Sequence, residues 1–155
     1  LPAVRKGGIL ILATDNRDEE PIGGPEYKSL LHMLKLQGID QYMRMIEAPG
    51  WIFTKDQWEP EMWAKVFRKV SEERFFYCTH TIPREDYCMI PGQCGLDLLE
   101  KKRRDPLRAV RKMVENALRF AVADYREKGI EPTVAFIREG PYLIPHLATG
   151  REQGR

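Results

Sequence analysis

The side chains of this sequence that could carry chemistry stand directly after stretches of apolar residues. Asn16 and Arg17 follow one such stretch, and His80 follows an aromatic one. A guanidinium can hold a carboxylate through two parallel hydrogen bonds, and an amide can donate to a substrate oxygen. An imidazole can contact a substrate or transfer a proton near neutral pH. These residue types point to the binding of a small polar substrate.

Each of these residues also has a purely structural interpretation. Arg17 could form a surface ion pair with Asp18 or Glu19. Asn16 is a turn residue type that tolerates a positive φ angle. His80, at the end of a strand, could simply be hydrogen-bonded. The sequence alone does not decide between the structural and the functional interpretation of these three residues.

The spacing of cysteine and histidine gives a weak indication of a metal site. Cys78 and His80 would project to the same face of a strand, because side chains alternate with a period of two. Two ligands are too few, and nothing places Cys88 and Cys94 beside them. We therefore predict no metal ligands in this chain. An odd number of cysteines without a Cys-x-x-Cys pair favours a reducing cytoplasm as the compartment.

Several functional classes are disfavoured by missing motifs and by charge. The sequence has no G-x-G-x-x-G dinucleotide motif, no P-loop, no G-x-S-x-G and no H-E-x-x-H. A net charge of +2 is too small to argue for nucleic acid or a membrane surface, and the basic residues 101–104 are interpreted as a solvated turn. The longest apolar run, residues 9–13, is far shorter than the ~20 residues that span a bilayer.

Alternating strand and helix patterns must position the candidate residues. The uninterrupted apolar run at 9–13 is typical of a strand covered on both faces. Further strands are expected at 74–80 and 133–137, with one short strand near 88–90. Helical spacing predicts helices at 27–38, 39–51, 56–70 and 105–129, with Asp56 and Asp105 as N-caps and Pro60 and Pro106 in first turns. The three tryptophans, Trp51, Trp58 and Trp63, are expected in the core or in packing against another domain, and Trp51 is the one expected to touch a partner surface.

Strands that alternate with helices predict an α/β fold. We expect three layers, with a mostly parallel sheet between helices, Rossmann-like in topology but without the dinucleotide fingerprint. Such sheets bind ligands beyond the carboxyl ends of their strands, so segments 15–24, 79–81 and 138–142 should meet there. The candidate residues for contact with substrate or cofactor are Asn16, Arg17, His80, Gly140 and Tyr142.

Length and composition fit one domain. The chain has 155 residues, of which 43% are apolar and 31% charged. We take residues 1–150 as a single α/β domain and 151–155 as a tail. The first residues include neither an initiator Met nor a hydrophobic signal region, so we expect the chain to begin inside a longer protein.

Four segments, in order along nearly the whole chain, resemble the carboxy-terminal domain of the nickel-pincer lactate racemase-like family. They are Val-Arg-Lys-Gly-Gly followed by Ile-Leu-Ile-Leu-Ala at 4–13, Gly-Gly-Pro-Glu-Tyr at 23–27, Asp-Gln-Trp at 56–58 with the aliphatic helix after it, and Arg-Glu-Gly-Pro-Tyr-Leu-Ile-Pro at 138–145. Each motif alone is weak, but their order and spacing are moderately specific.

The resemblance implies a share in racemase or epimerase chemistry on 2-hydroxy acids. Family members carry nickel in an organic pincer built on a nicotinic-acid skeleton, which a lysine and histidines of the amino-terminal domain hold. The full-length protein would then contain the nickel pincer nucleotide, whereas this chain would hold neither its tether nor its ligands. The chain would be a substrate-contacting lid, an isomerase domain inactive alone, with the amino-terminal domain and a small hydroxy acid as partners. The oligomeric state stays open.

The loop at residues 16–20 departs from what a lactate site requires. Its carboxylates would repel an anionic substrate by several kcal/mol, on the order of a close charge pair in a desolvated cleft. A polyol, an amine-bearing hydroxy acid or an altered site are therefore alternatives to lactate. The rival from a different class is a non-catalytic α/β module that binds a small ligand or another protein.

Overall fold

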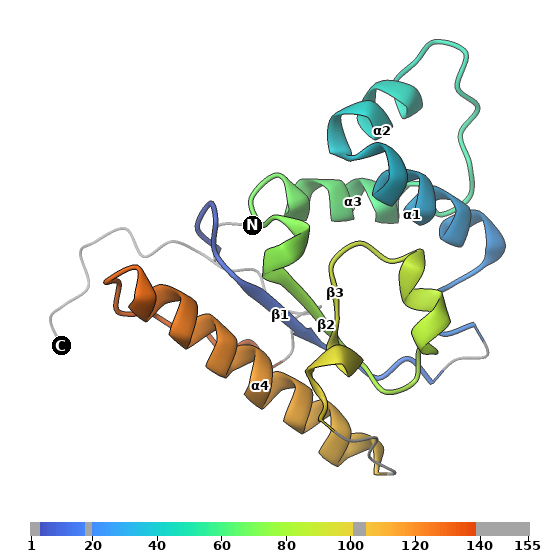
Figure 1. The fold of residues 1–155 in the computed structure, drawn as a ribbon. Helices are drawn as coiled ribbons and strands as arrows, with labels where there is room; N and C mark the ends of the chain where they lie inside the picture. The colour runs from blue at the N-terminus through green and yellow to red at the C-terminus, as the bar shows by residue number, and fades with distance from the viewer. Residues whose placement is uncertain (1–3, 18–19, 101–104, 139–155) are drawn as a thin grey trace, which may run out of the picture.

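The protein has a mixed α/β fold built on a small parallel sheet (Figure 1). The computed structural model describes residues 4–17, 20–100 and 105–138. Within them, strands β1 (Leu10–Ala13), β2 (Phe75–Cys78) and β3 (Gln93–Cys94) pair in the order β1-β2-β3, all parallel. The register aligns Ala13 with Cys78, so both long strands end at the same level.

Four α-helices surround this sheet in the described part of the chain. Three of them lie between β1 and β2, and the fourth follows β3. They are α1 (Pro25–Gln37), α2 (Ile39–Ile46), α3 (Trp58–Phe67) and α4 (Pro106–Glu127), with 3₁₀ turns η1 (Glu72–Arg74), η2 (Arg84–Cys88) and η3 (Gly95–Leu98) between them. None of these helices is long and apolar enough to cross a membrane.

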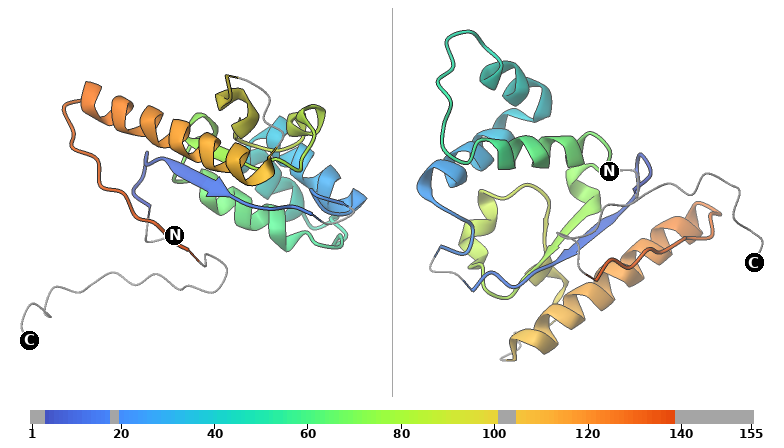
Figure 2. Two further views of the ribbon diagram at one scale, coloured as in Figure 1. Left: turned by 90° about the horizontal axis from the view of Figure 1, so that it is seen from below. Right: turned by 180° about the vertical axis from the view of Figure 1, so that it is seen from behind.

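Strand β2 is buried on both faces, because α3 and α4 lie on opposite sides of it (Figure 2). Phe75 and Tyr77 point into the larger core, where the Trp63 ring of α3 packs within 6 Å of both. Phe76 and Cys78 point the other way and pack against Ala109, Met113 and Ala117 of α4. Alternation of side chains along the strand thus supplies both layers of the core.

The helix signals of the sequence are confirmed at α1 and α4. Gly38 ends α1 with a positive φ of 73°. Asp105 caps α4 by accepting a hydrogen bond from the Arg108 backbone N–H, and Pro106 is the first residue of the helix. The expectation that Asp56 caps α3 is wrong, because Asp56 has a left-handed φ of 60° and the helix begins only at Trp58.

The predicted strand near residues 88–90 is also wrong. This segment ends η2, and the strand comes later, as β3. The reason is a half-buried contact between a cation and two carbonyls: Lys35 Nζ donates to the carbonyls of Tyr87 (3.0 Å) and Ile90 (2.7 Å). Those oxygens are therefore satisfied by a side chain instead of a neighbouring strand.

The expected strand at 133–137 is absent from the sheet of the described residues. This segment has no regular secondary structure, and the Phe136 side chain is 83% exposed.

The three tryptophans differ in how far they are buried. Trp63 packs against the larger core, in agreement with one of its two predicted places. Trp58 is 59% exposed and so lies outside the core, and its other predicted place, against another domain, stays a prediction. Trp51 is half-buried and donates from Nε1 to Gln57 Oε1 at 2.6 Å, and its contact with a partner stays a prediction.

Gly95 lets η3 approach the middle strand. A Cβ at this position would lie 2.6 Å from the Tyr77 carbonyl oxygen and 2.8 Å from the Cys78 Cα. Gly95→Ala should therefore cost about 1–3 kcal/mol of unfolding free energy in urea denaturation, as overpacking does. The matched control is Gly50→Ala, whose Cβ would meet nothing within 4 Å. Equal stability of both variants would contradict this close approach.

Asp124 fastens α4 to the start of β2. The Arg74 guanidinium at 2.8 Å, and then the Lys128 ammonium at 2.7 Å, lower the pKa of Asp124 to about 2. An unfolded aspartate titrates near ~3.9, so the stabilisation is complete above that pH and is lost as the pH falls toward 2.

Asp124→Asn should consequently lower the melting temperature at pH 7, and the gap to the parent should close on acidification to about pH 2. Thermal unfolding followed by circular dichroism between pH 7 and 2 measures this. Asp97→Asn, which removes only an exposed pair with Arg84, is the control. A gap that stays constant with pH would contradict the ion-pair account.

Candidate functional site

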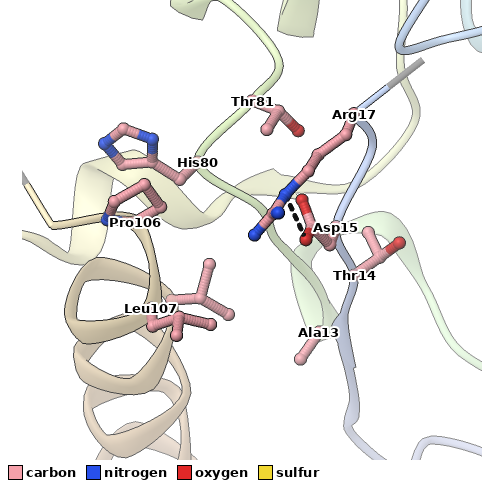
Figure 3. A pocket seen from close by; sticks show the side chains of 9 residues that line it. Ala13, Thr14, Asp15, Arg17, His80, Thr81, Pro106 and Leu107 are labelled. Atoms are coloured by element: carbon pink, nitrogen blue, oxygen red, sulfur yellow. Dashed lines mark ion pairs between the residues drawn. The ribbon is translucent and has the colours of Figure 1, made fainter.

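A hollow of about 240 Å³ opens where the carboxyl ends of β1 and β2 meet the first turn of α4 (Figure 3). This is the edge at which open parallel sheets bind their ligands. Apolar side chains of α4 form one wall, and polar side chains from the two strand ends form the other. The lining residues are Ala13, Thr14, Asp15, Arg17, His80, Thr81, Pro106, Leu107 and Val110.

Arg17 reaches into the middle of this hollow, where it meets Asp15 (Figure 3). Its Nε lies 2.7 Å from an Asp15 carboxylate oxygen, and the two side chains are 70% and 54% exposed. An ion pair this exposed contributes little to stability, about 0–1 kcal/mol. The guanidinium can therefore exchange part of this contact for a ligand at small cost. The expected structural partners were Asp18 or Glu19, which lie outside the described residues.

His80 lies at the other side of the hollow, beside Pro106 in the first turn of α4 (Figure 3). Its side chain is half-buried. The amino-terminal end of α4 carries the positive end of the helix dipole, which favours negative charge. Asp105 uses one of the free backbone N–H groups there, that of Arg108. Arg17 and the helix end thus bring positive charge to the hollow, next to the carboxylate of Asp15.

A small hydrogen-bond network supports the floor of the site. The Asn16 backbone N–H donates to Thr81 Oγ1 at 3.2 Å, and the Thr79 and Thr81 hydroxyls are 2.9 Å apart. The Asn16 side-chain amide donates to the Pro21 carbonyl at 2.8 Å. These bonds tie the loop after β1 to the loop after β2. These hydrogen bonds therefore fix the backbone next to Arg17, and with it the place from which the Arg17 side chain extends.

Asn16 holds the loop and does not line the hollow. Its Nδ2 also lies 3.4 Å from the hydroxyl of Tyr77, and burial raises the pKa of that tyrosine so that it stays protonated. Asn16 Oδ1 is buried and has no hydrogen-bond partner among the described residues. The structure thus gives Asn16 a positioning role, and the substrate contact that the sequence predicts for it stays a prediction.

Two of the three predicted segments meet at this edge of the sheet. The loops after β1 and β2 both line the hollow, and with them Arg17 and His80. Arg138 is exposed and does not line it. Gly140 and Tyr142 lie outside the described residues, so their predicted contacts stay predictions.

The wall supplied by α4 was missed in the sequence. Pro106 and Leu107 were interpreted only as the start of a helix, yet both line the hollow, with Pro106 beside His80. The order of elements contained the signal. A helix that follows a parallel strand begins at the carboxyl edge of the sheet, the same edge that carries the other candidate residues.

The described residues do not form a holder for a metal ion. No group of three or more His, Cys, Asp or Glu side chains gathers anywhere among them. Cys78, paired with His80 in the weak metal hypothesis, lies under α4, and burial raises the pKa of its thiol to about 12. A thiol of this kind resists the deprotonation that metal binding needs. The described part of the chain therefore does not fit a resident nickel group.

Comparison with protein-family models, with curated proteins and with solved structures finds no match to this chain. The grounds for a function are therefore the site and the sequence of the chain itself.

The hydrogen bonds among Asn16, Thr79 and Thr81 can be tested through the stability of the protein. Thr81→Val removes the acceptor of the Asn16 N–H and the partner of the Thr79 hydroxyl. We expect a loss of about 1–3 kcal/mol in urea denaturation, because a buried donor is left unpaired. The control is Thr54→Val, whose hydroxyl donates only to Ile52 O in an exposed loop. If Thr81→Val unfolds like the control, the network does not hold the two loops together.

Proposed function

We propose that this chain is the carboxy-terminal, substrate-contacting domain of a lactate racemase-like racemase or epimerase for 2-hydroxy acids. The observation that carries the proposal is the pairing of Arg17 with Asp15 inside a hollow that His80 also lines. The family resemblance of the four sequence segments supports the same assignment. The domain would be inactive without an amino-terminal domain.

The charge arrangement suits a hydroxy acid better than a simple anion. A 2-hydroxy acid carries a carboxylate, which the Arg17 guanidinium can bind, and an adjacent hydroxyl, which can donate to the Asp15 carboxylate. Asp15 neutralises part of the positive charge of Arg17. A ligand that has only a carboxylate should therefore bind more weakly than a 2-hydroxy acid, which can also donate its hydroxyl to Asp15. The carboxylates near the loop after β1 were expected to repel an anionic substrate. In the proposed arrangement one of them, Asp15, accepts a hydrogen bond from the substrate hydroxyl and so contributes to binding.

The hollow offers only part of the chemistry that racemisation needs. Racemisation of a 2-hydroxy acid requires an acceptor that takes up the hydrogen of the α-carbon with its electron pair and returns it to either face, and the side chains that line the hollow, His80 included, offer proton transfer but not hydride transfer. The resemblance implies that an amino-terminal domain would hold the nickel pincer, which would supply the hydride chemistry at the α-carbon. Arg17, Asp15 and His80 would bind and orient the substrate beneath it.

Two finer features belong to the same proposal. We assign the sheet to the three-layer, Rossmann-like class, with α4 as one outer layer and α1 and α3 as the other. We also assign the protein to the cytoplasm, in keeping with cysteines that are free although two of them are accessible at the surface.

A second candidate function is a non-catalytic protein-interaction module. The observation in its favour is a set of exposed apolar side chains around the loop before α3. Ile52, Phe53 and Trp58 are 83%, 70% and 59% exposed. Exposed apolar residues close together often mark a protein contact. In a two-domain enzyme the same residues could face the other domain, so they do not exclude the first proposal.

Binding of lactate to the chain tests the leading proposal. In calorimetric titrations with lactate, Arg17→Gln should weaken binding about tenfold or more, because it removes a charge-assisted hydrogen bond. His80→Gln should weaken it by a smaller factor. The matched controls are Arg44→Gln, on the exposed face of α2, and His32→Gln, on α1. Both controls should bind like the parent.

Two results would overturn this function. Equal affinity of the parent and of Arg17→Gln for lactate would show that Arg17 does not bind the substrate carboxylate. Racemisation of L-lactate by the isolated chain, followed by chiral chromatography, would contradict the assignment of the reacting groups to another domain. Capture of a protein through the Ile52–Trp58 region without any affinity for hydroxy acids would favour the second candidate.

A further inference from the structure

One edge of the sheet is open. Within the described residues β1 pairs with β2 alone, so the backbone groups along its other edge face away from any strand. Leu12 in this strand is 37% exposed, and Ala13 is exposed too. The sequence, in contrast, has the uninterrupted apolar pattern of a strand covered on both faces. An apolar open edge of this kind is a template for another strand.

The apolar surface of α4 extends beyond the strands that it covers. Its buried residues are Ala109, Met113 and Ala117, which lie over β2. Successive helix positions turn by 100°, so Val110, Val114 and Ala121 form a second stripe beside the first, and all three are only half-buried.

This second stripe lies on the β1 side of the helix. Val110 shares the hollow with Ala13, whereas Asn116, on the opposite flank, donates to Leu98 O of η3 at 2.7 Å. The uncovered part of α4 therefore projects past β1, over the place where a further strand would lie.

Residues 133–137 have the right composition and direction to fill this place. Val134, Phe136 and Ile137 are 62%, 83% and 46% exposed, although β-branched and aromatic residues favour buried strands. The chain turns back after α4 at Gly129, with a φ of 70°, and the Ile130 N–H binds the Tyr125 carbonyl. In both views of Figure 2 the segment then runs back from the end of α4 in the same general direction as β1.

Chain topology makes the open edge of β1 the expected destination. A helix that leaves one parallel strand returns to the same sheet by a right-handed crossover. In doubly wound sheets the strand after the reversal of order lies next to the first strand. Here β1, β2 and β3 extend in one direction, and α4 lies on the face opposite to α3. The next strand should therefore pair with β1.

We infer that residues 133–137 dock as a fourth parallel strand on the open edge of β1, beneath the uncovered stripe of α4, and that Arg138 then reaches the rim of the hollow as a second guanidinium for the substrate carboxylate. The part that concerns Arg138 rests on the proposed function. Docking itself does not, because it depends only on the open edge, the half-covered helix and the exposed segment.

Hydrogen exchange measured by NMR on the whole chain tests the docking. Alternate amides of residues 133–137 should exchange about 100-fold or more slowly than amides of an unstructured peptide. Neighbouring N–H groups of a strand point in opposite directions, so proline at only one of positions 134 and 135 removes a bond to β1. One of Val134→Pro and Ala135→Pro should therefore lower the melting temperature by about 5 °C or more beyond the other. Glu131→Pro, in the connection, is the control.

Two outcomes would overturn the docking. In the first, all amides of the segment exchange at unstructured rates and the three proline variants melt alike. In the second, protection appears only with a concentration-dependent dimer in light scattering, which would make a second copy the occupant of the edge.

Arg138→Gln separates this inference from the proposed function. If Arg138 lies at the rim, this variant should weaken lactate binding about threefold to tenfold, whereas Arg44→Gln leaves the affinity unchanged. Lactate binding that depends on Arg17 but not on Arg138 would refute the second guanidinium and leave the function standing. Amide protection without any lactate binding would support the strand and refute the function.

Discussion

The burial of β2 on both faces is the constraint on which the rest of the structure depends. Its four residues are all buried, Phe75 and Tyr77 toward α3 and Phe76 and Cys78 toward α4. A strand held between two apolar layers has a fixed direction and a fixed end. The polar residues that follow it, Thr79 to Thr81, are therefore held at one edge of the sheet. The network with Asn16 extends this order to the loop after β1.

The place of the candidate site is determined by this edge of the sheet. The register of β1 with β2 brings the residues after Ala13 and Cys78 to one level, and α4 begins beside them. Arg17 and His80 thus face one hollow although 63 positions separate them in the sequence. An arginine paired with an exposed aspartate provides both a donor fork and an acceptor. This combination is the physical reason why we propose a hydroxy acid, and not a simple carboxylate, as the ligand.

Sequence patterns predicted those elements whose signals are local. The apolar run of β1, the aromatic run of β2 and the Asp105-Pro106 start of α4 all form where their residue types indicate. The patterns failed where a distant partner decides the conformation. Lys35, which lies 52 and 55 residues before Tyr87 and Ile90, binds their carbonyls and so satisfies the backbone where the strand was expected. Likewise no local signal shows that Thr81 and Tyr77 hold Asn16 in the loop after β1.

Amide chemical-shift mapping with lactate tests the central claim most directly, namely that the strand ends and α4 form one binding site for a hydroxy acid. The account predicts that the shifts concentrate on Thr14 to Arg17, His80, Thr81 and the first turn of α4. Propionate, which lacks the hydroxyl, should cause smaller shifts at the same residues. Shifts spread over unrelated surfaces, or confined to the exposed loop around Phe53, would contradict the account.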